Sequence, residues 1–284
     1  MALSVSTAFT TLFDAEVKQK YQATRKLAGL VRERDAQGAS TVKFPKLGKG
    51  TATIRTPQSD VVPINATYSQ ATATMVDYGA FEYSDIFNQS HVNFNDRAEL
   101  VELVGNAIGR RMDQVVIDAL DAATPATVAN TIGGGGSAAD MNVAKIREAA
   151  KKLNANNVPA SDRVLLIHAN SLNALLGETQ ATSVDFVSTR NLLDGSVNTY
   201  MGFRIVVIGD MDEGGLTIDG SNDRIAYAFH KNAVGLGMSM NQQSRVDYVP
   251  EKTSFLVGSM FSAGAVAIED TTAGGIVKIT CRES

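Results

Sequence analysis

The stretch NDRAELVELVGNAIGRRMDQVVIDALDAA, residues 95–123, is the longest uninterrupted helical pattern in the chain. Its apolar residues recur three and four positions apart, which is the spacing of one helix face. Asp96 is positioned to cap the helix, and Glu99 three residues later completes a capping box. A helix of about 25 residues is about 38 Å long, comparable to the width of a small domain. We therefore expect a spine helix over residues 96–122.

The two faces of this spine differ in character. The apolar face consists of Leu100, Leu103, Val104, Ala107, Ile108, Met112, Val115, Val116, Ala119 and Leu120. The polar face carries Glu102, Asn106, Arg110, Asp113 and Asp118. We expect the apolar face to pack on a sheet of the same chain, and the polar face to be left for neighbouring copies.

Composition limits the classes of protein to consider. The 284 residues are 44% hydrophobic and 20% charged, which is ordinary for one large or two modest globular domains. A net charge of -4 argues against a surface that coats nucleic acid. The single cysteine, Cys281, excludes an internal disulfide and fits a reducing compartment. We see no signal peptide and no apolar run of the roughly 18 residues that span a bilayer, so we expect a soluble product made in the cytoplasm.

The N-terminal part of the chain contains two segments that differ in composition and apolar pattern. Residues 6–34 carry a broken apolar stripe and a basic face, which predicts an amphipathic helix. This helix could dock on its own domain or act as an arm on a neighbouring subunit. Residues 38–77 are rich in threonine, glycine and proline, with strand signals at residues 41–44, 51–56 and 67–76. A two-stranded ribbon is marginal in water, so we expect this long hairpin to lie on another subunit.

A glycine-rich segment, TPATVANTIGGGGSAAD at residues 124–140, follows the spine. Gly133, Gly135 and Ala138 satisfy a loose dinucleotide-binding pattern, but the preceding element is a helix and not a core strand. No Lys followed by Ser or Thr completes a phosphate loop. We interpret the segment as a loop between elements.

The remainder of the chain mixes helices and strands. Apolar patterns predict helices beginning near Asp140 and Asn170, and core strands at residues 164–167, 203–208 and 225–229. Residues 178–201 are polar, and we expect them to form a loop on the surface. After Gly235, strand patterns recur at residues 245–249, 254–261, 265–269 and 276–280, and we expect all of them to form an antiparallel sheet on the spine. The fold class is therefore α+β, with an α/β unit inserted between the spine and the C-terminal strands.

Residues for catalysis or metal binding are sparse. His91, His168 and His230 are isolated, with no ligand-type partner at metal-site spacing. The acidic turns at residues 210–213 and 219–223 do not match a calcium-binding loop. We predict no enzyme activity, no cofactor and no metal.

The order of elements resembles that of the major capsid proteins of tailed double-stranded DNA bacteriophages. The most similar passages are VDYGAFEYSDIFNQS, residues 76–90, and NNVPASDRVLLIHANSLNALL, residues 156–176. The resemblance implies an N-terminal arm at residues 1–38, an extended hairpin loop at 39–78, a peripheral domain at 79–124 and 231–284, and an axial domain at 125–230. It further implies pentamers and hexamers of this chain in an icosahedral shell around packaged DNA, located in the virion and assembled in the host cytoplasm.

In such a shell the hairpin would lie on a neighbouring copy. Its basic residues Lys43, Lys46, Lys49 and Arg55 could then pair with Asp96, Glu99 and Glu102 at the beginning of an adjacent spine. Exposed pairs contribute at most about 1 kcal/mol each, so repetition over many copies would make them matter. A separate scaffolding protein and a portal are the other expected partners, with no sequence-specific DNA binding and no membrane.

Two other classes of protein remain open at this point. An encapsulin-like nanocompartment would resemble the same fold but enclose a cargo enzyme. A soluble α/β enzyme would use the acidic turns or the glycine loop.

Overall fold

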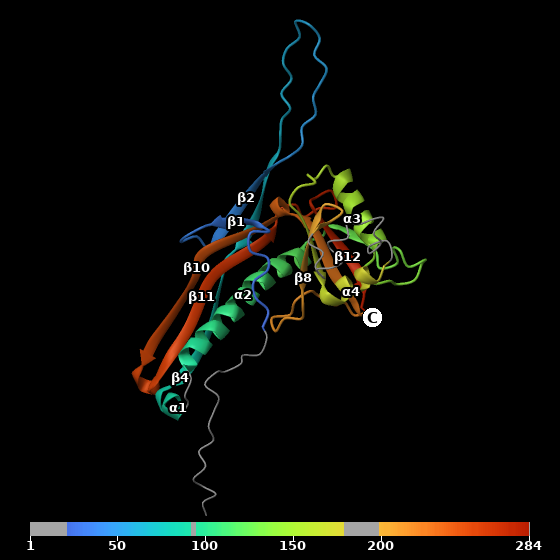
Figure 1. Cartoon of the computed structure of the whole chain (residues 1–284). Coiled ribbons are helices and arrows are strands. Elements are labelled where there is room, and N and C mark those ends of the chain that lie inside the picture. The colour runs from blue at the N-terminus through green and yellow to red at the C-terminus, as the bar shows by residue number, and fades with distance from the viewer. Residues whose placement is uncertain (1–21, 92–94, 179–198, 284) are drawn as a thin grey trace, which may run out of the picture.

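The computed structural model of the chain describes residues 22–91, 95–178 and 199–283. Its helices are α1 (Ile86–His91), α2 (Asp96–Ala122), α3 (Val143–Ala155) and α4 (Ala169–Gly177), with short 3-10 turns η2 (Lys231–Ala233) and η3 (Pro250–Lys252). Its strands are β1 (Arg32–Asp35), β2 (Thr41–Leu47), β3 (Tyr68–Thr74), β4 (Val76–Asp85), β5 (Ala126–Val128), β6 (Arg163–His168), β7 (Thr199–Tyr200), β8 (Phe203–Ile208), β9 (Asp223–His230), β10 (Val234–Val249), β11 (Ser254–Ala267) and β12 (Ile276–Arg282). Figure 1 shows an elongated body built along α2, with a hairpin projecting from one end.

The spine is confirmed as α2, which is 27 residues long, or about 40 Å. Its cap is Asn95 and not Asp96, because the Asn95 side chain accepts a hydrogen bond from the Ala98 amide. An asparagine at this position stabilises a helix as well as an aspartate does. Ile108 and Leu120 are buried on the apolar face, as the periodicity predicts.

A four-stranded sheet in the order β1-β10-β11-β4 packs against the spine. β4 contains most of the capsid-like passage at residues 76–90 and runs antiparallel to β11, from Val76 opposite Ala263 to Asp85 opposite Ser254. Tyr78 stacks on Phe261 with ring centroids 5.1 Å apart, and the Arg111 guanidinium lies 4.8 Å from the Tyr78 centroid. Aromatic and cation-π contacts therefore join the sheet to the helix.

A six-stranded sheet in the order β5-β12-β9-β6-β8-β7 forms the second unit. The predicted strands at residues 164–167, 203–208 and 225–229 lie within β6, β8 and β9. The expectation for residues 276–280 is wrong in one respect. They form a strand, β12, but it pairs with β5 and β9 in this sheet and not with the sheet on the spine. An alternating pattern in the sequence indicates which face of a strand is buried, but it does not indicate which other strand it pairs with.

The hairpin is confirmed only near its base. β2 and β3 pair antiparallel from Thr41 opposite Thr74 to Leu47 opposite Tyr68. The predicted strand at residues 51–56 is absent, and residues 48–67 form a long exposed loop with no regular strand. Phe44 is fully buried against the body, where its ring fills the space that a side chain at Gly235 would need. The base is therefore docked on its own chain, and the rest of the loop projects (Figure 1).

The predicted helix at residues 6–34 is not found in its described part, and residues 1–21 lie outside the described residues. Residues 22–31 run irregularly along the spine, and Gly29 reverses direction with a φ of +73°. β1 then pairs in parallel with β10. Apolar residues of the predicted stripe are nevertheless buried, since Leu27 and Val31 are each 1% exposed. Their backbone forms hydrogen bonds with other elements, and this overrides the helical propensity.

Candidate assembly surfaces

Apolar side chains are exposed along the projecting loop. Ile54 is 98% exposed, Val61 76%, Val62 67% and Ile64 62%. Single exposed apolar residues are ordinary, but several on one thin loop have no surface of their own chain to cover them. This exposed apolar group is a candidate surface that the basic residues alone did not reveal. The sequence signal was its concentration within a stretch otherwise rich in glycine and proline.

The four predicted basic residues of the hairpin do not lie together in one environment. Lys46 is turned toward its own chain, where its Nζ donates a 2.9 Å hydrogen bond to the Ile268 carbonyl oxygen. Lys43, Lys49 and Arg55 are exposed. Three of the four are therefore available to another molecule, and Lys46 helps to fix the hairpin base.

The predicted acidic residues gather at the first turns of α2. Asp96 accepts a 2.7 Å hydrogen bond from the Ser84 hydroxyl, which ties the start of the spine to β4. Glu99 is partly buried, and Glu102 is exposed. Carboxylates at a helix N-terminus are stabilised by the positive end of the helix dipole. In Figure 1 this end of α2 lies at the opposite end of the body from the projecting loop. A contact between the two surfaces therefore requires two copies of the chain.

The polar face of the spine is only partly free, which corrects the expectation that it is left for neighbours. Asp113 is 2% exposed, and its carboxylate accepts hydrogen bonds from the backbone amides of Lys26 at 2.6 Å and Leu27 at 3.1 Å. Arg110 is 7% exposed and pairs with Glu213 at 2.8 Å. Both side chains hold other parts of the same chain against the helix. Desolvation by burial raises the pKa of the Asp113 carboxyl above its ordinary value, although the two amides and Arg25 partly oppose this.

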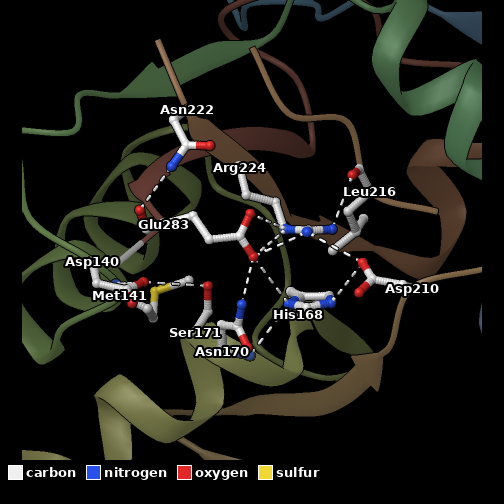
Figure 2. Close-up of polar contacts among 10 residues, drawn as sticks. All are labelled: Asp140, Met141, His168, Asn170, Ser171, Asp210, Leu216, Asn222, Arg224 and Glu283. Carbon is white, nitrogen blue, oxygen red and sulfur yellow. Dashed lines mark hydrogen bonds and ion pairs between the residues drawn. The ribbon is translucent and has the colours of Figure 1, made fainter. Parts of the chain in front are cut away.

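A polar cluster at the far end of the six-stranded sheet holds the C-terminal segment (Figure 2). Arg224 lies between two carboxylates, with Nη2 3.0 Å from Glu283 and 3.2 Å from Asp210. Asn170 donates a 2.6 Å hydrogen bond to Glu283. His168 lies between the same carboxylates, with Nε2 3.3 Å from Asp210 and Nδ1 3.6 Å from Glu283. The cluster joins β6, α4, β9 and the end of β12.

The charge states in this cluster follow from its surroundings. Desolvation by burial, together with the positive charge of Arg224, lowers the pKa of His168 below 6.5, against the opposing effect of Asp210 and Glu283. Its Nδ1 therefore accepts a hydrogen bond from the Asn170 amide at 3.2 Å. The pKa of Glu283 is also lowered, because hydrogen bonds from Arg224 and Asn170 outweigh its burial. The cluster holds the buried side chains of His168 and Arg224 in fixed positions between Glu283 and the more exposed Asp210.

The glycine loop has an internal structural explanation. Gly133 has a φ of +80°, and a side chain there would collide with Asn142, whose amide donates to the Ile132 carbonyl at 2.9 Å. Lys145 is fully buried, and its Nζ donates to the carbonyls of Ala139 at 2.6 Å and Thr280 at 2.9 Å. These bonds tie the loop to α3 and β12. The capping residue of α3 is Asn142, two residues after the Asp140 near which the helix was expected to begin.

Within residues 22–91, 95–178 and 199–283, no three His, Cys, Asp or Glu side chains are grouped to hold a metal ion. None of the helices described is long and apolar enough to cross a membrane. Cys281 is buried, and burial raises the pKa of its thiol to about 12, so it is not a reactive thiolate.

A projecting hairpin and a long spine helix that carries two sheets are the main features of this fold. The chain belongs to the phage capsid protein family, because the model of that family matches residues 5–283. Membership makes it a structural component of a bacteriophage capsid, and hence of the virion.

Solved structures show the same fold. The capsid of cyanophage P-SCSP1u matches with a TM-score of 0.77 at 16% identity, over 100% of this chain and 96% of that one. The head of Helicobacter pylori bacteriophage KHP40 matches with a TM-score of 0.78 at 13% identity, over 98% and 97%. The capsid of cyanophage Pam1 matches with a TM-score of 0.71 at 12% identity, over 99% and 98%. None of the curated proteins compared with the chain matches it.

Proposed function

We propose that this chain is the major capsid subunit of a tailed bacteriophage, and that pentamers and hexamers of it close an icosahedral shell around double-stranded DNA. The hairpin loop of one copy lies on the next copy, where Ile54 and Val62 lose their exposure to water. Lys49 and Arg55 then approach Glu99 and Glu102 at the beginning of the neighbouring spine. Burial of the apolar loop supplies most of the affinity, and the charges set the register.

The observation that carries this proposal is the separation of the two surfaces within one chain. The loop at residues 48–67 is exposed along its length and projects from one end of the body, whereas α2, whose seventh residue is Glu102, begins at the other end (Figure 1). One chain cannot cover its own loop in this arrangement. Repeating the contact around a symmetry axis covers every loop and produces a closed ring.

The family match favours a phage shell over an encapsulin-like compartment. In our proposal the four-stranded sheet with the spine forms the peripheral domain, and the six-stranded sheet forms the axial domain that gathers at a local symmetry axis. Because β12 belongs to the six-stranded sheet, we assign residues 276–282 to the axial domain. A separate scaffolding protein and a portal are the partners that the proposal adds.

Electron microscopy of the chain expressed alone and with its phage's scaffolding protein tests the proposal. We expect closed, uniform shells with the scaffolding protein, and irregular or open assemblies without it. Native particles should contain double-stranded DNA. A purified chain that stays monomeric at high concentration under all these conditions would refute the capsid function.

Charge reversal tests the contact between hairpin and spine. Lys49→Glu alone and Glu102→Lys alone should each reduce shell yield, and the double variant should recover part of it, because each pair then again has opposite charges. Asp247→Lys, an exposed acidic residue on β10, is the matched control. Equal losses in the single and double variants would show that the two residues do not face one another.

A further inference from the structure

The edge of the four-stranded sheet that β4 forms is open to one more strand. β4 is the last strand in the order β1-β10-β11-β4, and it pairs with β11 without interruption from Val76 to Asp85. Within residues 22–91, 95–178 and 199–283, no strand pairs with the other side of β4. An edge strand presents a row of backbone amides and carbonyls, and an extended segment of another molecule can bind to them by strand addition.

β4 lacks several features that usually protect an exposed edge. Bulges, prolines and lysines commonly prevent an edge strand from pairing with another chain. The pairing of β4 with β11 contains no bulge, and its sequence, VDYGAFEYSD, contains neither proline nor lysine. Its three charged residues, Asp77, Glu82 and Asp85, are all acidic. The edge therefore repels a second acidic strand, such as another copy of β4, and favours a basic one.

The side chains of β4 alternate between the spine side and the outer side of the sheet. On the spine side, the Arg111 guanidinium lies 4.8 Å from the centroid of the Tyr78 ring. The Ser84 hydroxyl donates a 2.7 Å hydrogen bond to Asp96 on the same side. Glu82 has the same place in the alternation as these two β4 residues, so its exposed side chain is also on the spine side. Its carboxylate therefore extends the acidic surface at the beginning of α2 toward the open edge.

The outer side of β4 is aromatic and exposed. Phe81 is 54% exposed and Tyr83 is 42% exposed. The Phe81 ring lies over Gly79 and Gly258, where an added side chain would collide with it. The Lys252 ammonium lies 4.0 Å from the centroid of the Tyr83 ring. The two rings form an exposed apolar surface beside the open edge.

Residues 51–56, TATIRT, have the composition of a strand that lacks a partner. Four of the six residues are β-branched. All six are exposed, and they form no strand in the single chain. In an extended conformation, Ile54 and Arg55 point to opposite faces. The segment therefore offers an apolar side chain to one side of a sheet and a basic side chain to the other.

We propose that residues 51–56 of one copy bind to β4 of a second copy as a fifth strand of its sheet, with Arg55 opposite Glu82. The inference rests on the proposed function, which brings the loop onto a neighbouring copy. The charges of the two strands are complementary, because residues 49–56 contain two basic residues and no acidic one, and β4 contains three acidic residues and no basic one. Figure 1 shows the loop pointing away from β4 of its own chain, so the partner is a second copy.

Either direction of the added strand gives the same kinds of contact. Placing Arg55 opposite Glu82 puts Ile54 on the outer side of the sheet. In a parallel strand Ile54 is directly opposite Phe81, and in an antiparallel strand it is directly opposite Tyr83. Pairs of opposite charge and pairs of an aromatic with a β-branched side chain both stabilise neighbouring strands. The segment becomes a strand only when the second copy supplies the edge.

Disulfide formation between copies tests the register. In shells assembled from the full-length chain, Arg55→Cys with Glu82→Cys should form a disulfide between neighbours under mild oxidation, because side chains directly opposite in a sheet have Cβ atoms about 5 Å apart. Denaturing electrophoresis without reductant should show linked chains that separate on reduction. The natural Cys281 is buried and stays outside the reaction.

Arg55→Cys with Tyr83→Cys is the matched control, because it moves one cysteine by one residue to the opposite side of β4. Its chains should stay unlinked. Glu82→Cys alone should also stay unlinked. Linked pairs of this single variant would show that two β4 edges pair with each other, and would overturn the proposal.

Exchange of the charges tests the same pair without cysteines. Arg55→Glu alone and Glu82→Arg alone should each weaken one contact by up to about fivefold, and shell yield should fall with it. The two changes together should restore much of the yield. Arg55→Glu with Asp77→Arg should not, because residue 77 lies on the outer side of β4 and residue 55 on the spine side.

Hydrogen exchange of the wild-type chain gives a further measurement that needs no substitution. The amides of residues 51–56 and of β4 should exchange more slowly in shells than in the unassembled chain, because both strands gain backbone hydrogen bonds. The amides of β9, which is paired on both sides in the single chain, should exchange alike in the two samples. This measurement decides the question if the cysteine variant does not assemble.

Failure of this inference and failure of the capsid function give different results. Normal shells without the link between residues 55 and 82, and without added protection of either segment, would overturn the strand addition and leave the capsid function standing. Equal linking in the matched control would also overturn it, because the side chains would then have no fixed register. A wild-type chain that forms no shells would refute the proposed function and this inference with it.

Discussion

At the scale of single residues, buried polar side chains hold separate segments of the chain together. The apolar pattern of the sequence could not reveal these contacts. Asp113 lies on the side of α2 that periodicity assigns to solvent, yet it is 2% exposed and anchors the N-terminal segment. Arg224 and Glu283 join strands that are far apart in sequence. Each of these groups is stabilised by partners that only the folded chain brings near.

Removing the Asp113 carboxylate should release the N-terminal segment. Asp113→Ala leaves the amides of Lys26 and Leu27 without acceptors, which should lower the free energy of unfolding by about 2 kcal/mol. Urea unfolding measures this loss, and faster trypsin cleavage near Lys26 reports local release. Glu102→Gln, a substitution at an exposed position on the same helix, should change neither reading. Unchanged cleavage in Asp113→Ala would show that apolar packing alone holds the segment.

The cluster around His168 should make the fold sensitive to acid. Because the folded-state pKa of His168 is lowered, the unfolded chain binds more protons as the pH falls below about 6.5, and stability falls with it. The groups that face this imidazole are Asp210, Arg224 and Glu283. The stabilisation from Glu283 is present above pH 4.5 and is lost at still lower pH, because its folded-state pKa is lowered too.

Thermal unfolding of wild-type and His168→Gln at pH 7.5 and pH 5.5 isolates the histidine contribution. The wild-type midpoint should fall more between these values than that of the variant, in which position 168 does not titrate. An equal fall of the midpoint in the two proteins would contradict a role for His168. In the control variant Glu102→Gln, the midpoint should fall between these pH values as much as in the wild-type chain.

At the scale of elements, the spine has one face buried in the fold and an exposed first part to which our proposal assigns assembly. Ile108 is 2% exposed in the core between α2 and the sheets. Glu102, six residues earlier on the same helix, is exposed. The two residues therefore allow folding and assembly to be separated within one helix.

Ile108→Asp should abolish folding, because an unpaired buried charge costs more than about 4 kcal/mol. Glu102→Lys should leave the unfolding midpoint unchanged and reduce shell yield. Circular dichroism and sedimentation velocity measure the two effects. If both variants lose folded structure to the same extent, the exposed end of the spine is part of the core and not an interface.

The projecting loop should matter for assembly and not for folding. Ile54→Asp combined with Val62→Asp places charges where the loop would be buried on a neighbour, so shell yield should fall while the melting temperature stays the same. Thr51→Asp adds a charge to the same loop without removing an apolar side chain and should have a much smaller effect. Normal shells from the double variant would show that the loop remains solvent-exposed after assembly.

Local patterns account for most of these elements but not for all of their partners. The five apolar residues of β8 and the long periodicity of α2 are local signals, and the structure places both elements where they were expected. The strand at residues 51–56 was wrong because β-branched composition does not make a strand without a partner. β1 was missed because its pairing with β10 joins residues about 200 positions apart. Of the predicted contact residues, Lys46 proved to be turned inward, which composition cannot reveal.

At the scale of the whole molecule, our proposal requires opposite charges at opposite ends of the body to favour assembly even though the chain is acidic overall. Copies with a net charge of -4 repel one another at long range. Local pairs between basic loops and acidic spine ends would offset this repulsion where the copies meet.

Salt should therefore act on assembly in two directions. The Debye length shortens from about 10 Å at 0.1 M salt to about 3 Å at 1 M, which screens both the general repulsion and the exposed pairs. If the pairs guide assembly, light scattering should show slower growth of correct shells at high salt. The chains should also aggregate more readily, because salt screens their mutual repulsion. Growth that only accelerates as salt rises would mean that the apolar loop acts alone.

The position of β12 has a further consequence for synthesis of the chain. In the six-stranded sheet β12 lies between β5 and β9, although β5 is made about 150 residues earlier. While residues 276–282 are still unmade, the nascent chain must keep β5 and the outer edge of β9 unpaired, and exposed edges of this kind invite pairing with other chains. Since polysomes hold many such chains close together, folding helpers of the host should matter most in this interval, before any shell has begun to form.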